Sequence, residues 1–515
     1  MKILYFLDFP FNIGGSNKVL ITQAYIMQQK GFQVKVIIPN DERGLHDSEY
    51  DNICTSYCLP VTTERYHMAT CIESIDILTA FQDYEAILQL IKAFKPDLIH
   101  SAQLNIAVEL AARELRIPHL MNIYQVDRQS FFLDWLKMYP CYHSADSQMM
   151  CERWGRGLGI PSRCIRVAYK VKEETVKCNG RTDKTLLHIV STGVVYENKN
   201  QLETIKFVLK CKENGYNVKL TILGECNSAY AEKCKRFVKE KGLSYSVIFK
   251  GFVSNVEDYL QEADLFILAS RVESYPGVIV ESMANKIPII STPVAGVPEL
   301  LKDGENGFLT DGYEAVHIYQ TFLRYVEYLK AGKVSTVVEN AYSTYLKNHT
   351  YEAVGEQLED YYLWIVRDYN KQSNSYLLYK EIKNQIDNFI NEKKIDRTNQ
   401  SCMRNIWFLY HIYPILENKK IMIWGAGFWG AIALEWLEPL QEKIEFAGFI
   451  DVNKKGEYLG YPIAANRTEA ILECDIVLVA VSDSEAILEI MGNLEKHDKE
   501  RNKDYFLLNN FPIRI

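Results

Sequence analysis

Short apolar runs alternate with segments of helical periodicity along most of the chain, and this alternation starts again twice. The runs lie at residues 2–8, 33–38, 97–101 and 119–124, then at 187–193, 218–224, 247–251, 265–270 and 287–291, and finally at 420–424 and 446–450. Such alternation is typical of parallel, doubly wound sheets, in which a covering helix follows each strand. The pattern therefore predicts an α/β fold with two facing Rossmann-like domains and a third, C-terminal Rossmann-like α/β domain.

A length of 515 residues agrees with three domains at the usual ~150 residues each. The polar stretch 173–184 marks the first boundary, and helical periodicity continues after the second α/β region. We expect domains or connectors at residues 1–178 (first Rossmann-like domain), 179–350 (second Rossmann-like domain), 351–415 (crossover helix and helical connector) and 416–515 (third domain). Ligands of such domains should lie beyond the carboxyl ends of the strands.

Charge and cysteine usage argue against two classes of partner. The chain has 58 basic and 66 acidic residues and a net charge of −8, so no global cationic field would recruit nucleic acid. Its 12 cysteines form no Cys-x-x-Cys unit. Cys54, Cys58, His67 and Cys71 lack the spacing of a common zinc site. We expect neither a nucleic-acid partner nor a bound metal.

The first eight residues fit a strand better than a signal peptide, because Asp8 interrupts the apolar run early. No uninterrupted apolar segment of the sequence approaches the ~20 residues that span a bilayer. We therefore expect a cytoplasmic protein. The aromatic stretch 130–139 fits either buried helix core or contact with a lipid surface, which leaves a peripheral position at the inner face of the plasma membrane open.

Two glutamates flank a strand-to-helix connection in the second predicted domain. Glu273 follows the apolar run 265–270, and Glu281 stands eight residues later. Pro276 and Gly277 lie where a helix should begin, since the fixed φ of proline suits a first helical turn and glycine lets a ligand approach the backbone. The free N–H groups and positive end of that helix favour an anion. The spacing therefore predicts an elongated polar ligand with a phosphate near its centre.

This segment resembles the Glu-x7-Glu signature of retaining glycosyltransferases of the GT-B fold, specifically glycosyltransferase family 4, over roughly residues 1–365. The resemblance implies that Glu273 contacts hydroxyls of a donor sugar and that Glu281 binds the ribose of a nucleotide. The backbone of Tyr275, Pro276 and Gly277 would hold the diphosphate. The implied donor is a UDP- or GDP-linked sugar, and the resemblance implies no metal.

The same resemblance assigns roles to glycine-containing loops on both sides of the expected cleft. A Gly-Gly pair ending in Gly15 resembles the loop that lies close to the donor sugar and diphosphate, although an ordinary turn is the alternative for a lone pair. Gly193 and Gly224 follow strands of the second domain and would border the nucleotide. The loop after Gly193 ends in Lys199, which would neutralise charge on the leaving diphosphate. The catalytic candidates are therefore Glu273, Lys199 and Gly15.

The chain departs from the family pattern at several positions. Val194 stands where the family usually has an arginine, and Arg271 is the nearest cation that could replace it. His100 resembles the first of two histidines often found there, but the second is absent, and a core histidine is an equal alternative. A further histidine of many relatives is also missing, and Tyr124 or Gln125 occupies that region.

A dinucleotide-type fingerprint opens the third domain. Gly425, Gly427 and Gly430 follow the apolar run 420–424, and Asp451 ends the next predicted strand. The loop resembles Rossmann domains of sugar-nucleotide enzymes, including oxidoreductases and certain acyltransferases. We expect it to bind a nucleotide, with NAD(P) among the candidates, and a domain that only scaffolds is the alternative. No Tyr-x-x-x-Lys follows, so no dehydrogenase activity is assigned.

Together the resemblances imply a retaining glycosyltransferase that moves a sugar from a nucleoside diphosphate to a glycan or lipid-linked saccharide, as in the assembly of bacterial surface polysaccharide. Two alternatives stay open. One is a nucleotide-sugar-modifying oxidoreductase run by the C-terminal domain. The other is a catalytically weak, transferase-like partner subunit, which Val194 favours and the presence of Lys199, Glu273 and Glu281 disfavours.

Overall fold

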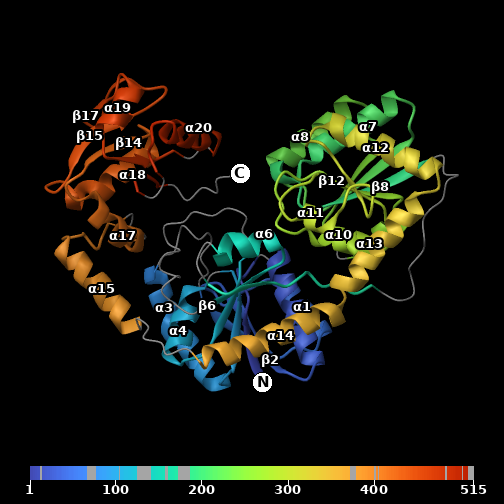
Figure 1. Cartoon of the computed structure of the whole chain (residues 1–515), viewed down its shortest axis with the longest axis horizontal. Coiled ribbons are helices and arrows are strands. Elements are labelled where there is room, and N and C mark those ends of the chain that lie inside the picture. Colours follow the sequence, from blue (N-terminus) through green and yellow to red (C-terminus); the bar gives the residue numbers. More distant parts are fainter. Residues whose placement is uncertain are drawn as a thin grey trace.

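The structure is a computed structural model in which three α/β sheets lie apart from one another (Figure 1). The described residues are 1–11, 14–66, 77–103, 105–123, 141–156, 160–171, 186–253, 255–371, 379–399, 402–403, 405–481, 484–500 and 503–508. The boundary expected within 173–184 and the aromatic stretch 130–139 lie outside these residues.

The first sheet is parallel throughout, and within the described residues it has seven strands in the order β3-β2-β1-β4-β5-β6-β7. The strands are β1 (Lys2–Phe6), β2 (Gln33–Asn40), β3 (Val61–Arg65), β4 (Leu98–Ala102), β5 (His119–Asn122), β6 (Cys141–Ala145) and β7 (Ser162–Cys164). The helices are α1 (Gly15–Gln29), α2 (Ser48–Ser56), α3 (Ile77–Phe94), α4 (Ile106–Glu114) and α6 (Gln148–Cys151), which continues into a π-helical turn (Glu152–Arg156). Helices cover both faces, so β1 is a continuous apolar run.

The second sheet repeats this arrangement with the parallel order β10-β9-β8-β11-β12-β13. Its strands are β8 (Leu187–Thr192), β9 (Val218–Leu223), β10 (Val247–Gly251), β11 (Leu265–Leu268), β12 (Ile289–Ser291) and β13 (Phe308–Leu309). Its helices are α7 (Gln201–Glu213), α8 (Ala229–Glu240), α9 (Val256–Glu262), α10 (Gly277–Ala284), α11 (Val297–Leu300), α12 (Ala315–Lys330) and α13 (Val334–Asn348). The strand at which the order reverses is β8, so its carboxyl end is the expected ligand position.

Helix α14 (Tyr351–Tyr369) carries the chain from the second domain back onto the first (Figure 1). The Thr350 hydroxyl caps it by accepting the N–H of Ala353. Its apolar residues recur at helical spacing and are buried in the cluster that contains β1, β2 and α1. The Tyr362 hydroxyl lies 2.6 Å from Nδ1 of His100, which is fully buried, and burial lowers the pKa of His100 to about 3. His100 is therefore a core residue.

Helices α15 (Tyr379–Glu392) and α17 (Ile406–Leu416) connect α14 to the third sheet. Tyr379 stacks on Tyr84 of α3 with ring centroids 3.9 Å apart. Buried residues of α15 and α17 belong to one apolar cluster with α3, α4 and the third sheet. The third domain is thereby anchored to the first domain.

The third sheet has six strands in the described part of the chain, in the order β16-β17-β15-β14-β18-β19, and only β16 and β17 pair antiparallel. Its strands are β14 (Lys420–Trp424), β15 (Glu445–Ile450), β16 (Gly456–Tyr458), β17 (Tyr461–Ile463), β18 (Ile476–Val479) and β19 (Tyr505–Leu507). Its helices are α18 (Phe428–Leu437), α19 (Arg467–Glu473) and α20 (Ser484–Glu495). The predicted fold class is confirmed, and the antiparallel hairpin at the edge makes this third sheet mixed.

Candidate active site

A cleft of about 1280 Å³ separates the first and second domains. The first domain contributes the loop before α1, the start of α1 and the exposed side of α2, and the second contributes the carboxyl ends of β8 and β9 and the start of α10. The residues around it are Phe11, Gly14, Gly15, Lys18, Asp47, Ser48, Glu49, Asn52, Ile53 and Ser56 of the first domain, and Thr192, Gly193, Val194, Leu223, Gly224, Glu225, Phe252, Val253, Val256, Val278 and Glu281 of the second. Gly15, Gly193, Gly224 and Glu281 of the predicted site therefore meet in one cleft.

The floor of the cleft requires glycine. Thr192 pairs with Leu223 in the β8–β9 register, which places Gly193 beside Gly224. Both have positive φ, +128° at Gly193 and +138° at Gly224, and a Cβ on Gly224 would lie 2.2 Å from the carbonyl oxygen of Gly193. Side chains larger than hydrogen are excluded at Gly224, and the backbone of both strand ends stays open to a ligand.

Glu281 lies in α10, which begins at Gly277 with Pro276 as its N-cap, as the sequence predicts. Glu281 is half-buried, and burial raises the pKa of its carboxyl to about 7. The ammonium of Lys18 partly offsets this shift, and the carboxylate of Glu257 adds to it. A carboxyl held out of water at the edge of a cleft is suited to accepting hydrogen bonds from ligand hydroxyls.

Stability is expected to fall as the pH rises through the range set by Glu281. The pKa of Glu281 is about 7 in the folded state and has the ordinary value of 4.5 in the unfolded state. Between these two pH values the folded state binds more protons than the unfolded state, so the free energy of unfolding decreases as the pH rises, and the loss is complete above pH ~7. The upper limit is about 3 kcal/mol, lowered by the remaining exposure of the group. Thermal unfolding of wild type and Glu281→Gln should therefore differ more at pH 8 than at pH 5. Burial also raises the pKa values of Asp8 and Asp146, but their contributions cancel when the variant is compared with wild type at the same pH. An equal difference in melting temperature at pH 5 and pH 8 would show that Glu281 is solvated.

Lys199 and Glu273 form an ion pair. The ammonium of Lys199 lies 2.5 Å from Oε1 of Glu273, and the Ser270 hydroxyl donates to the same oxygen at 2.7 Å. Lys199 ends a 3-10 turn (Glu197–Lys199), and its stem packs 3.4 Å from where a Cβ of Gly193 would lie. The structure thus brings the predicted cation and carboxylate together behind Gly193, and neither lines the cleft directly.

Tyr275 is placed differently from the other predicted residues. It is buried, its ring lies 4.8 Å below the guanidinium of Arg166, and its hydroxyl lies 3.3 Å from Nε2 of His349. The Tyr275 side chain therefore packs under the loop that precedes α10, and only the backbone of Tyr275 is available to a ligand.

The candidate substitute for the missing arginine lies near Lys199. The Arg271 N–H donates to the Asn198 carbonyl at 2.7 Å, and the Arg271 side chain is exposed outside the cleft lining. Val194 lines the cleft. The sequence analysis missed Lys18, a cleft cation in the first turns of α1 that lies 3.1 Å from Glu49. A lysine three residues after a Gly-Gly pair at a helix start is the signal that could have identified it.

Other candidates lie elsewhere. Tyr124 and Gln125 are outside the described residues, as are His67 and Cys71 of the cysteine group. Among the residues that are described, no three His, Cys, Asp or Glu side chains cluster in a way that could hold a metal ion. In the same part of the chain, no helix combines the length and the apolar character needed to cross a membrane.

In the third domain, Asp451 forms a hydrogen bond with the backbone of the glycine loop. Oδ2 of Asp451 accepts the N–H of Ala426 at 2.8 Å, and the Tyr458 hydroxyl donates to the Gly427 carbonyl at 2.9 Å. A Cβ on Gly430 would lie 2.0 Å from the Gly425 carbonyl oxygen, so α18 packs tightly on the loop. Nothing described lies within 4 Å of a Cβ built on Gly427. The predicted residues Gly425, Gly427, Gly430 and Asp451 therefore form one unit at the carboxyl ends of β14 and β15.

Two family models match the chain around the cleft. The model described as Glycosyltransferase Family 4 matches residues 13–197, and the model described as Glycosyl transferases group 1 matches residues 173–329. Both matches end before the crossover helix and the third domain.

Individual relatives match over shorter stretches. The Vi polysaccharide biosynthesis protein VipC/TviE of Salmonella typhi is 31% identical over 151 residues, which are 29% of this chain and 26% of that protein. Across several curated relatives, the alignments span 20% to 40% of the relative's own length.

Solved structures match both domains. A glycosyltransferase from Rickettsia africae has a TM-score of 0.60 at 16% identity and covers 71% of this chain and 99% of its own. Anabaena Alr3699/HepE in complex with UDP and glucose has a TM-score of 0.57 at 18% identity over 70% and 99%. At these identities the likeness concerns the fold. Fold and family matches agree: the chain carries a family 4 glycosyltransferase domain over residues 13–197 and a group 1 glycosyltransferase domain over residues 173–329, in the fold of solved GT-B glycosyltransferases.

Proposed function

We propose that the protein is a retaining glycosyltransferase that transfers a hexosyl group from a nucleoside diphosphate to a glycan or lipid-linked saccharide. The observation that carries this proposal is the cleft in which Glu281 and the start of α10 face Gly15 across the domain boundary. The match to a polysaccharide biosynthesis protein of Salmonella typhi supports a role in bacterial surface polysaccharide assembly. We propose that the protein acts in the cytoplasm. The UDP in the Anabaena neighbour supports UDP as the nucleotide.

The diphosphate would lie at the amino end of α10, where free N–H groups and the helix dipole stabilise an anion. We call residues 273–276 the donor loop. Glu273 would hold hydroxyls of the donor sugar and Glu281 the ribose hydroxyls, while Gly193 and Gly224 allow the nucleotide to approach the strand ends. Lys199 already bonds Glu273 and has two further N–H groups, so it could bond a phosphate oxygen while it orients that carboxylate.

In the proposed reaction the bond from the sugar to the diphosphate oxygen breaks and a bond to the acceptor oxygen forms on the same face of the sugar. The acceptor proton passes to the departing diphosphate oxygen, so no carboxylate nucleophile of the enzyme is required. This differs from retaining glycosidases, which use a pair of carboxyl groups. The protein would contribute positioning and stabilisation of the negative charge that develops on the leaving group.

The acceptor would bind on the first-domain wall. Asp47, Ser48, Asn52 and Ser56 line that side of the cleft together with the apolar side chain of Ile53. Short polar side chains beside an apolar residue suit a saccharide, which presents hydroxyl groups on its rim and C–H groups on its faces.

The test is a binding and hydrolysis screen of the full chain against UDP- and GDP-linked sugars. We expect one nucleotide class to raise the melting temperature and to be hydrolysed slowly without acceptor. Glu281→Gln should weaken that binding about 10-fold or more, since a carboxylate bonded to hydroxyls is replaced by an amide. Asp451→Asn is the matched change in the third domain and should leave this binding unaltered. If Asp451→Asn alone removes binding, the nucleotide site lies in the third domain and the proposal is wrong.

A nucleotide site in the third domain is our second candidate function. The open space at Gly427, which begins α18 without a side-chain cap, favours it. NAD(P) or a sugar nucleotide fits a loop of this kind. Binding that survives Glu281→Gln and disappears in Asp451→Asn would support it, and reduction of NAD(P) in the presence of a sugar nucleotide would support an oxidoreductase.

A further inference from the structure

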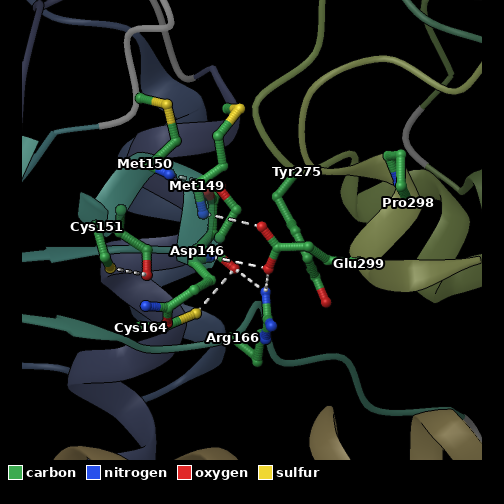
Figure 2. A network of polar contacts seen from close by, with 12 residues as sticks. Asp146, Met149, Met150, Cys151, Cys164, Arg166, Tyr275, Pro298 and Glu299 are labelled. Carbon is green, nitrogen blue, oxygen red and sulfur yellow. Dashed lines mark hydrogen bonds and ion pairs between the residues drawn. The ribbon is translucent and has the colours of Figure 1, made fainter. Parts of the chain in front are cut away.

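A second set of contacts joins the first and second domains beside the cleft. It connects the turn after β6 and the start of α6, residues 146–149, with the donor loop and α11 (Figure 2). The mechanism proposed above uses none of the side chains in this set.

Asp146 supports the donor loop from the other domain. The Ser274 hydroxyl donates to Oδ1 of Asp146 at 2.8 Å, and Asp146 is only 6% exposed. Ser274 directly follows Glu273, and its carbonyl accepts the N–H of Gly296 at 3.0 Å. The residue next to the proposed sugar-binding carboxylate is therefore held by both domains.

Glu299 of α11 makes the stronger part of the connection. Its two carboxylate oxygens accept the N–H groups of Gln148 at 2.8 Å and Met149 at 2.9 Å. Arg166 donates to the same carboxylate at 2.8 Å and to the carbonyl of Asp146 at 2.9 Å (Figure 2). One guanidinium therefore bonds a residue of each domain. These bonds lower the pKa of Glu299 although burial acts against them. Charge-assisted bonds of this kind are stronger than neutral ones.

The interface is closely packed where these contacts meet. A Cβ on Gly296 would lie 2.0 Å from the Ser274 carbonyl oxygen and 3.2 Å from Cβ of Ser147 in the first domain. Below the loop, His349 bonds the Val167 carbonyl through Nδ1 at 2.8 Å, and the Tyr169 N–H donates to the His349 carbonyl at 2.9 Å. The donor loop therefore packs against the segments that connect the two domains, around residues 167–169 and His349.

We propose that Asp146, Ser274 and Glu299 form an interdomain latch that holds the donor loop in its binding geometry while the two domains are closed. Separation of the domains would break the bonds of Ser274 and Glu299 at the same time, and the loop would lose its support from the first domain. Closure of the cleft and alignment of Glu273 would then be one event. The positioning role of the latch rests on the proposed function, whereas its effect on domain closure does not.

The latch predicts different effects on two ligands. A nucleoside diphosphate would contact mainly the second domain, whereas the sugar of the intact donor would also reach Gly15 of the first domain. Loss of the latch should therefore weaken binding of the sugar nucleotide about 10-fold, as for one charge-assisted hydrogen bond, and change binding of the nucleotide alone by less than about twofold. A change that merely destabilised the fold would weaken both.

The experiment uses the full chain with Asp146→Ala, Asp146→Asn, Ser274→Ala, the double variant Asp146→Ala/Ser274→Ala, and Glu299→Ala. Small-angle X-ray scattering without ligand measures closure, and calorimetric titration with UDP and the sugar nucleotide from the screen measures binding. Glu339→Ala is the matched control, because Glu339 pairs with Lys286 at 2.8 Å within the second domain.

We expect Asp146→Ala and Glu299→Ala to increase the radius of gyration, and Glu339→Ala to leave it at the wild-type value. Asp146→Asn keeps an oxygen that accepts the Ser274 hydroxyl and should restore closure. The double variant should resemble Asp146→Ala, since the shared bond is lost only once. Wild-type scattering from Asp146→Ala and Glu299→Ala would overturn the latch. A wild-type protein that binds no sugar nucleotide would instead count against the proposed function, and the scattering comparison would still decide the latch.

Discussion

Replacing Lys199 by methionine is expected to lower the rate of sugar transfer about 100- to 1000-fold, the loss typical of removing one preorganised charge from a transition state. Methionine keeps most of the apolar stem that packs on Gly193, so the turn after β8 should remain folded. The change removes the cation that bonds Glu273 at 2.5 Å. The rate constant at saturating donor is the quantity to measure, because the charge that Lys199 would stabilise develops only as the diphosphate leaves.

Glu273→Gln separates this role from simple support of the carboxylate. If Lys199 acted only by orienting Glu273, the double variant Lys199→Met/Glu273→Gln would transfer sugar no more slowly than Glu273→Gln alone. If Lys199 also stabilises the leaving group, the double variant should be slower by a further factor of about 10 or more. Normal turnover in Lys199→Met would rule out both roles.

The sequence predicts those parts of the fold that depend on local patterns. Long apolar strands such as β1, β8 and β14 are buried on both faces, so composition alone identifies them. The short strand β7 (Ser162–Cys164) was not recognised, because three half-buried residues give no periodic signal. The edge strand β3 (Val61–Arg65) lacks an apolar pattern as well, because Val61 is its one apolar residue.

The candidate site divides in the same way. Gly193, Gly224 and the start of α10 were predictable because backbone geometry at strand and helix ends has a signature in glycine and proline. The pairing of Lys199 with Glu273 depends on residues 74 positions apart in the chain, and the pairing of Arg166 with Glu299 on residues 133 apart. No local pattern records such contacts.

Gly224→Ala is expected to destabilise the second domain and to abolish nucleotide binding. The new Cβ would lie 2.2 Å from the carbonyl oxygen and 2.5 Å from the carbonyl carbon of Gly193, and both are backbone atoms that cannot rotate away. The strand ends of β8 and β9 must separate to admit the methyl group, and overpacking of this kind together with the positive φ costs about 3 kcal/mol or more.

Gly215→Ala distinguishes this clash from the general cost of a side chain at positive φ. Gly215 lies in the same domain with φ +78° and has nothing within 4 Å of its Cβ position, so its replacement should cost only about 1 kcal/mol. Chemical unfolding and nucleotide titration of both variants give the comparison. Equal destabilisation by the two substitutions would mean that β8 and β9 can move apart freely, and the cleft floor would then be adaptable instead of fixed. A larger loss in Gly224→Ala, with binding retained in Gly215→Ala, would place the need for glycine in the contact between the two strand ends, where the proposed nucleotide approaches the backbone.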